Sequence, residues 1–200
     1  MSELLEMLKE ENRQIHDFEL RNPSNLKSVE DEFGDGYYNE YYQHLLQLVE
    51  GFADLQDSDV LRLIAYSIYD PRSAVARKIA EQKDKALPVV DELVRQSLPD
   101  DREHAAGILM YMLKDPSLSC GTRKTVIDRL FGMLGDQDTG VLFEVINALG
   151  VLGNSQAVAA LQQLAQSDPH SYRYMGKGRL RYPVREAAQR RLDDIQSLVA

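Results

Sequence analysis

Apolar side chains recur along most of the chain at spacings of three and four residues, the period of an α-helix with one buried face. Alternation of single apolar and polar residues, which is typical of strands, is almost absent. We therefore expect an all-α protein. The pattern predicts helices over residues 2–21, 37–53, 58–70, 72–82, 87–98, 101–114, 121–135 and 139–152, and two more that begin at residues 155 and 183.

Helix-breaking residues separate these stretches and support their boundaries. Pro116 follows Asp115 and ends one helix, because the residue before a proline avoids the α region. Gly153 suits the left-handed position just past a helix end, and Ser155 is the expected N-cap of the helix after it. Pro183 fits the first turn of the last helix, where a missing N–H costs nothing.

Most of the predicted helices are short, and most of the connections between them are short as well. Short connections place consecutive helices antiparallel and side by side. A short helix is only marginally stable alone in water, so each must bury its apolar face against neighbours. Stacked helix pairs meet this requirement, because each pair covers the face that the next one exposes.

Residues 138–199 resemble HEAT-like repeats, and residues 70–137 resemble them more loosely. Ala148 and Ala188 are 40 residues apart, within the usual HEAT period, and small residues let paired helices approach closely. Arg185 occupies the position where the family often has an arginine that bonds into the turns between repeats. The resemblance implies an α-solenoid, that is, an α-α superhelix of antiparallel helix pairs over residues 70–200, with residues 1–69 as an N-terminal helical cap or a continuation of it.

The composition narrows the classes of function. A net charge of −9 argues against nucleic-acid or membrane binding by the whole surface. The single Cys120 excludes an intramolecular disulfide and a cysteine zinc site. The N-terminus lacks the basic start and apolar run of a signal peptide, and no stretch approaches the ~18 apolar residues that span a bilayer. We expect a cytoplasmic protein without a bound metal or cofactor.

One stretch, residues 170–182, is unusually long and basic for a connection between repeats, and we call it the basic segment. It contains no acidic residue, and residues 173–191 carry seven basic side chains against one acidic. Arginine can pair with phosphate or carboxylate groups, and tyrosine can stack on a base or anchor a protein contact. The candidate partner-binding residues are Tyr172, Arg173, Tyr174, Lys177, Arg179, Arg181, Tyr182 and Arg185. The alternative is a solvated insertion that balances the acidic remainder of the chain.

The N-terminal region has the opposite charge. Residues 1–59 contain fifteen acidic and four basic side chains. Acidic and tyrosine side chains together suit a basic protein partner, because charge guides encounter and tyrosine anchors the contact. The candidates here are Asp31, Glu32, Asp35, Tyr37, Tyr38 and Tyr41. The alternative is a loop and a cap helix whose tyrosine rings are buried.

The chain offers no convincing catalytic set. His16, His44, His104 and His170 are scattered, and no two have the i, i+4 spacing of a helical metal site. Cys120 is more typical of a small structural thiol than of a nucleophile. A non-enzymatic protein-interaction module, such as a scaffold, adaptor or immunity-type inhibitor of a basic partner, is therefore the favoured function. Nucleic-acid binding or DNA repair through the basic segment, and a phycobilin lyase-like role, are the alternatives.

Overall fold

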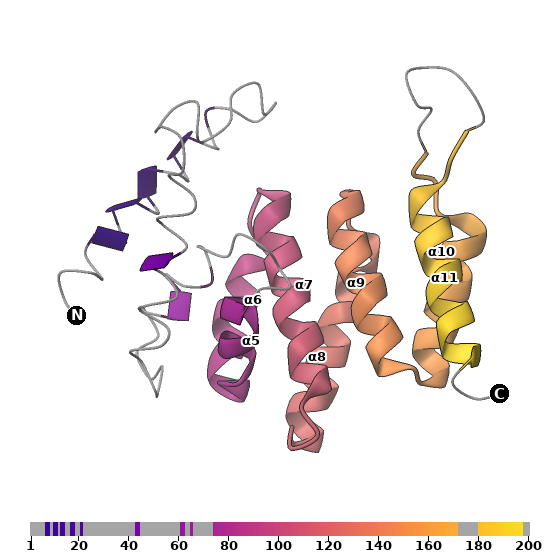
Figure 1. Cartoon of the computed structure of the whole chain (residues 1–200), viewed down its shortest axis with the longest axis horizontal. Helices are drawn as coiled ribbons and strands as arrows, with labels where there is room; N and C mark the ends of the chain where they lie inside the picture. The colour runs from indigo at the N-terminus through magenta and orange to yellow at the C-terminus, as the bar shows by residue number, and fades with distance from the viewer. Residues whose placement is uncertain are drawn as a thin grey trace. The chain divides into compact units, whose positions relative to one another are not determined.

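The computed structural model describes residues 74–171 and 180–197, together with isolated positions between residues 7 and 65. Contacts divide the chain into two compact units, residues 1–104 and 105–200, each considered by itself. Every regular element of the described part is helical (Figure 1). The elements are α5 (Ala74–Ala80), η1 (Lys83–Ala86), α6 (Leu87–Leu93), α7 (Pro99–Lys114), α8 (Cys120–Gly132), η2 (Met133–Gly135), α9 (Thr139–Leu152), α10 (Ser155–Ser167) and α11 (Pro183–Ser197).

These elements confirm the all-α prediction. The isolated described positions between residues 7 and 65 are also helical. The proposal that residues 1–69 form a distinct cap remains a prediction, because most of them lie outside the described part. None of the helices in the described part combines the length and the apolar character that crossing a membrane requires.

In the first unit, α6 ends earlier than the pattern over residues 87–98 predicts. The amides of Arg95 and Gln96 bond to carbonyls three residues back, at 3.1 Å each, so the helix tightens after Leu93 and stops. α7 then begins at Pro99, two residues before its predicted start, because proline is well tolerated in a first helical turn. An ion pair of 2.8 Å between Arg62 Nε and Glu92 Oε2 connects position 62 to α6.

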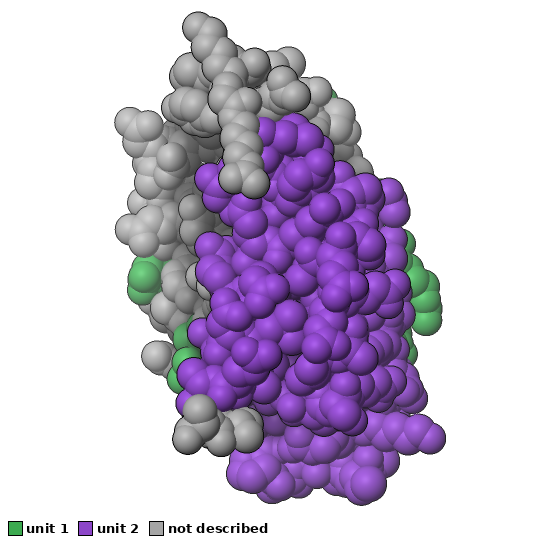
Figure 2. All heavy atoms as spheres, turned by 90° about the vertical axis from the view of Figure 1, so that its right-hand side faces the viewer, with its two compact units in different colours: residues 1–104 green, residues 105–200 purple. Residues whose placement is uncertain are grey.

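In the second unit, α9 is the central helix. It contacts α8, α10 and α11, and Figure 1 shows α9, α10 and α11 side by side. Its buried apolar residues fall on more than one face, which its several neighbours explain. They are Val141, Leu142, Val145, Ile146, Ala148 and Leu149. Figure 2 shows the second unit as one continuous mass of packed atoms.

α11 packs on α9 and α10 through a narrow apolar stripe. Val184, Ala188 and Leu192 on this helix are buried, and Ala148 on α9 is fully buried too. Ala148 and Ala188, the small residues on which the HEAT resemblance depends, are therefore both buried, one on each of the two helices. The opposite side of α11 is polar, since Gln189, Arg190, Asp193, Asp194, Gln196 and Ser197 are all exposed.

The turn between α9 and α10 is two residues long and reverses the chain direction. Gly153 adopts the left-handed conformation with φ 58°, and its N–H bonds to Leu149 O at 3.0 Å, which confirms the predicted helix stop. The predicted N-cap, Ser155, is wrong by one residue. Asn154 Oδ1 accepts the Ala157 N–H at 2.8 Å, whereas Ser155 is already helical.

The cap assignment can be tested by replacing each candidate separately. Asn154→Ala removes the acceptor for a first-turn amide, so we expect it to lower the free energy of unfolding by about 1 kcal/mol. Ser155→Ala removes a hydroxyl from an adjacent helical position and is the matched control, with an expected change within about 0.5 kcal/mol. Urea denaturation monitored by circular dichroism measures both. Equal losses in the two variants would contradict the assignment.

A buried carboxyl group lies at the start of α7. Asp101 is only 4% exposed, and its Oδ2 makes no hydrogen bond within the described part. Desolvation by burial, reinforced by neighbouring Asp100, raises the pKa of Asp101 to about 6, although Arg102 opposes the shift. The helix N-terminus favours an anion here, but burial has the larger effect.

This shift makes stability depend on pH. The folded pKa of Asp101 lies above the ordinary value of 3.8, so its contribution is fully present below pH 3.8 and is lost as the pH rises through about 6. Asp101→Asn mimics the neutral form of the carboxyl group. Near pH 8 we expect the free energy of unfolding of this variant to exceed that of wild type by up to about 3 kcal/mol. Near pH 4 the two proteins should have similar free energies of unfolding. Denaturation at both pH values tests this, and a pH-independent difference would contradict it.

Candidate interaction site at the basic segment

The structure describes only the two ends of the basic segment. Among the predicted partner-binding residues, Arg181, Tyr182 and Arg185 lie within the described part. Tyr172, Arg173, Tyr174, Lys177 and Arg179 lie outside it, as do Asp31, Glu32, Asp35, Tyr37, Tyr38 and Tyr41 of the N-terminal region. The binding role of all these residues therefore remains a prediction.

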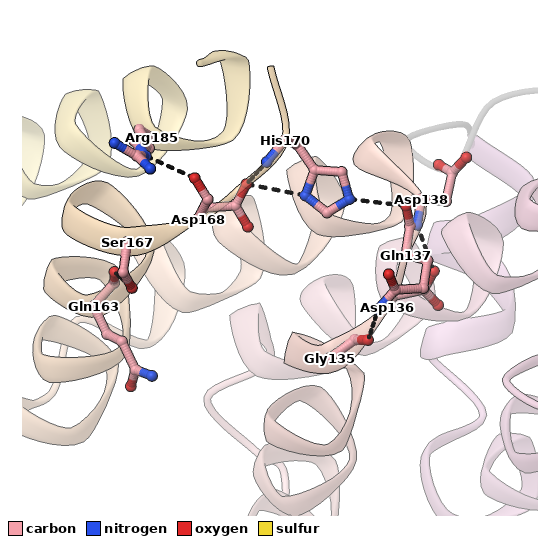
Figure 3. A network of polar contacts seen from close by, with 9 residues as sticks. All are labelled: Gly135, Asp136, Gln137, Asp138, Gln163, Ser167, Asp168, His170 and Arg185. Carbon is pink, nitrogen blue, oxygen red and sulfur yellow. Dashed lines mark hydrogen bonds and ion pairs between the residues drawn. The ribbon is translucent and has the colours of Figure 1, made fainter.

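Asp168, the residue that follows α10, bonds both to the first residue of the basic segment and to the helix after the segment (Figure 3). Its buried carboxylate accepts two bonds from His170 through Oδ1, from the backbone N–H at 2.9 Å and from ring Nδ1 at 3.0 Å. Its backbone carbonyl accepts a bond of 2.7 Å from Nε of Arg185, which lies in the first turn of α11. One residue thus connects the chain entering the segment to the helix that follows it.

His170 extends this anchor to the turn between α8 and α9. Its Nε2 lies 3.0 Å from the backbone oxygen of Gln137. That turn is well ordered by its own bonds, because Asp136 Oδ1 accepts the Asp138 N–H at 2.9 Å and Asp138 Oδ1 caps α9 by accepting the Gly140 N–H at 2.7 Å. The segment therefore starts from a fixed point that joins two successive inter-repeat turns.

The hydrogen bonds around His170 also change its titration. Desolvation by burial lowers the pKa of the His170 ring. The hydrogen bonds to Asp168 and to the Gln137 carbonyl, with the negative charges of Asp168 and Asp138, outweigh this effect, so the pKa of His170 is raised above its ordinary 6.5. The protonated ring is favoured at this position.

At the other end of the segment, two of the predicted binding cations have partners within the chain. The guanidinium of Arg185 lies over the Tyr182 ring, 4.1 Å from its centroid, in a cation–π contact. Arg181 donates to Glu186 through Nε at 2.7 Å and forms an ion pair with it. The bond from Arg181 lowers the pKa of Glu186. Arg185, which also donates to the Asp168 carbonyl, lies at the turn between repeats where the HEAT resemblance predicts an arginine.

A second polar connection joins α9 to α11. Arg191 donates to Asn147 Oδ1 through Nη2 at 2.7 Å and Nε at 3.2 Å, and its Nη1 lies 3.0 Å from Asp194 Oδ2. The arginine side chain passes over Gly150, where an added Cβ would lie 2.9 Å from Arg191 Cδ. Glycine at position 150 therefore leaves the space that this arginine fills.

Sequence reasoning missed Asp168, Gln137 and Asn147 as polar anchors. The anchor at Asp168 could have been predicted from two features of the sequence. An Asp-Pro pair follows α10 directly, and Arg185 lies at the position where the family often has an arginine. The Gln137 contact uses a backbone carbonyl, which carries no side-chain signal.

Elsewhere, Cys120 is exposed at the start of α8. Within the part of the chain that the structure describes, no three His, Cys, Asp or Glu side chains are grouped closely enough to hold a metal ion.

A match to one family model agrees with this architecture. Residues 86–175 match the family model described as HEAT repeats. Curated proteins give no match. A crystal structure of an engineered protein from the Northeast Structural Genomics Consortium is similar over 82% of this chain and 69% of its own, with 22% identity and a TM-score of 0.40.

Removing the Arg185 side chain should weaken the anchor measurably. Arg185→Ala leaves the Asp168 carbonyl without this donor and removes the Tyr182 stacking, so we expect the free energy of unfolding to fall by about 1–2 kcal/mol. Arg190→Ala removes an exposed arginine from the same helix and serves as the control, with an expected change within about 0.5 kcal/mol. Chemical denaturation compares them, and equal effects would mean that the anchor contributes nothing.

Proposed function

Residues 86–175 of this chain belong to the HEAT repeat family, and from this premise we propose that the protein is a non-enzymatic protein-interaction module that works in the cytoplasm. HEAT repeats generally act as scaffolds for protein interactions, since stacked helix pairs present extended surfaces. The architecture alone does not name a partner, because one fold hosts many functions. The charge distribution of the chain supplies the further argument.

We place the principal contact on the basic segment. The observation that carries this proposal is the double anchor at Asp168, which accepts bonds from His170 at the start of the segment and from Arg185 after it. A long insertion without a role needs no such anchoring, whereas a binding loop mounted on a rigid support loses less entropy on association. Arg181 and Arg185 have intramolecular partners, so Arg173, Lys177 and Arg179 are the cations that we expect to contact an acidic protein surface.

The acidic N-terminal region provides a second surface in this proposal. Residues 1–59 carry fifteen acidic side chains against four basic ones, and Tyr37, Tyr38 and Tyr41 are interleaved with them. Such a surface would attract a basic protein, as in an inhibitor or immunity-type protein that neutralises it. The two surfaces predict partners of opposite charge, and variants that change one surface at a time can distinguish them.

Affinity capture from the native host followed by mass spectrometry should recover a stoichiometric protein partner. Arg173, Lys177 and Arg179 should be changed together to alanine, and we expect this variant to lose the partner while its Tm changes little. The matched control removes three exposed cations elsewhere, by changing Lys85, Arg95 and Lys124 to alanine. It has the same net charge and should retain binding.

Salt dependence gives an independent test of the charge argument. Contacts between exposed charges are screened as the Debye length falls from about 10 Å at 0.1 M salt to about 3 Å at 1 M. Capture should therefore weaken progressively over this range. Binding that is insensitive to salt, or equal loss in the control variant, would contradict the basic segment as the contact. Recovery of RNA or DNA, with a gel shift at micromolar protein, would favour the nucleic-acid alternative instead.

A further inference from the structure

The imidazole of His170 lies between two acceptors that both require a proton from it. Nε2 is 3.0 Å from the backbone oxygen of Gln137, and Nδ1 is 3.0 Å from Asp168 Oδ1. A carbonyl oxygen can only accept, so Nε2 must carry a proton to bond with Gln137. An ionised carboxylate also only accepts, so Nδ1 needs a proton as well. A neutral imidazole has one N–H and can make only one of these bonds.

The surroundings of the ring favour the second proton. Asp168 lies two residues before His170. Its side chain is only 5% exposed and that of His170 is 22% exposed, so solvent only partly screens the attraction between them. From the turn between α8 and α9, Asp138 adds a second negative charge. Asp136 of that turn accepts the Asp138 amide. From α11, Arg185 is the opposing positive charge, and its Nε is directed to the Asp168 carbonyl.

We propose that His170 is a proton-dependent clamp between two successive inter-repeat turns. With both ring nitrogens protonated, it ties the Gln137 carbonyl, before α9, to the Asp168 carboxylate, after α10. After losing one proton, it keeps at most one of these two bonds, and the turns are no longer joined through it. The clamp lies where the basic segment begins, so protonation sets how firmly that end is held. The proposal does not depend on the partner inferred above.

The sign of the pH effect follows from the direction of the shift. The pKa of His170 is raised in the folded protein above its ordinary 6.5. The stability that the clamp contributes is therefore fully present below pH 6.5 and is lost as the pH rises through the higher folded pKa. Other carboxylates also titrate at acid pH, so the effect is visible only as a difference between matched variants.

NMR titration of the histidine rings tests the clamp directly. We expect the His170 ring of the full chain to titrate above 6.5. Asp168→Asn keeps an oxygen acceptor for the His170 amide and leaves the backbone carbonyl for Arg185, but it removes the negative charge. In this variant the His170 midpoint should shift downward. A wild-type midpoint at or below 6.5, or one that Asp168→Asn leaves unchanged, would overturn the proposal.

Thermal unfolding adds a readout that does not rely on ring titration. His170→Gln replaces the ring with an uncharged amide, whose N–H groups share one nitrogen and do not titrate, so any bonds that it makes are independent of pH. At about pH 5.5 we expect the Tm of the His170→Gln variant to be roughly 2–4 °C below that of wild type. At a pH above the wild-type His170 midpoint that the NMR titration gives, where the ring has lost its second proton, the difference should largely disappear. A difference that stays constant across this range would mean that His170 acts only by packing.

Discussion

The structure depends on the burial of apolar stripes between helices that are not stable alone. The described α-helices have between 7 and 16 residues, near or below the length at which isolated helices become even marginally stable in water. α9 shows the consequence most clearly, because its apolar residues are buried against α8, α10 and α11 together. Each helix is stable because neighbouring helices bury its apolar face. Within the described part, stability therefore comes from the packing of each helix against its neighbours.

Polar contacts have a different task in this arrangement. They are concentrated at the turns, where helix ends leave backbone groups without helical partners. Asn154 and Asp138 satisfy amides at helix starts, and Arg123 donates to the carbonyls of Leu113 and Asp115 at the end of α7, at 3.2 and 2.8 Å. These bonds set where each helix begins and ends. The anchor at Asp168 extends the same principle across a long insertion between α10 and α11.

Charged side chains are distributed unevenly over this helical framework. A helix stack offers surface, and the distribution of side chains over that surface decides what it attracts. The chain is acidic as a whole, yet residues 173–191 carry a net charge of +6. We therefore expect a partner with a limited acidic area, because the acidic remainder of the chain repels polyanions in general.

The sequence determined the helices themselves, because the spacing of apolar residues is a local property. The bounds 139–152 were predicted correctly, as were the glycine stop at position 153 and the start at Pro183. The resemblance also placed Arg185 at the turn between repeats. The predicted helix bounds were wrong where the position of a helix end depends on which nearby group accepts a backbone N–H. Asn154 caps α10 in place of Ser155, and α6 ends earlier than predicted.

The polar anchors were decided by the tertiary structure alone. His170 reads as an isolated histidine in the sequence, because its two partners are a carboxylate two residues away and a backbone carbonyl 33 residues away. The Asn147 to Arg191 bond spans 44 residues and needs the space above Gly150. Such contacts form only when the stack brings distant turns together. Local apolar periodicity specifies each helix, whereas the partner of a polar group is set by where the packing of those helices places it.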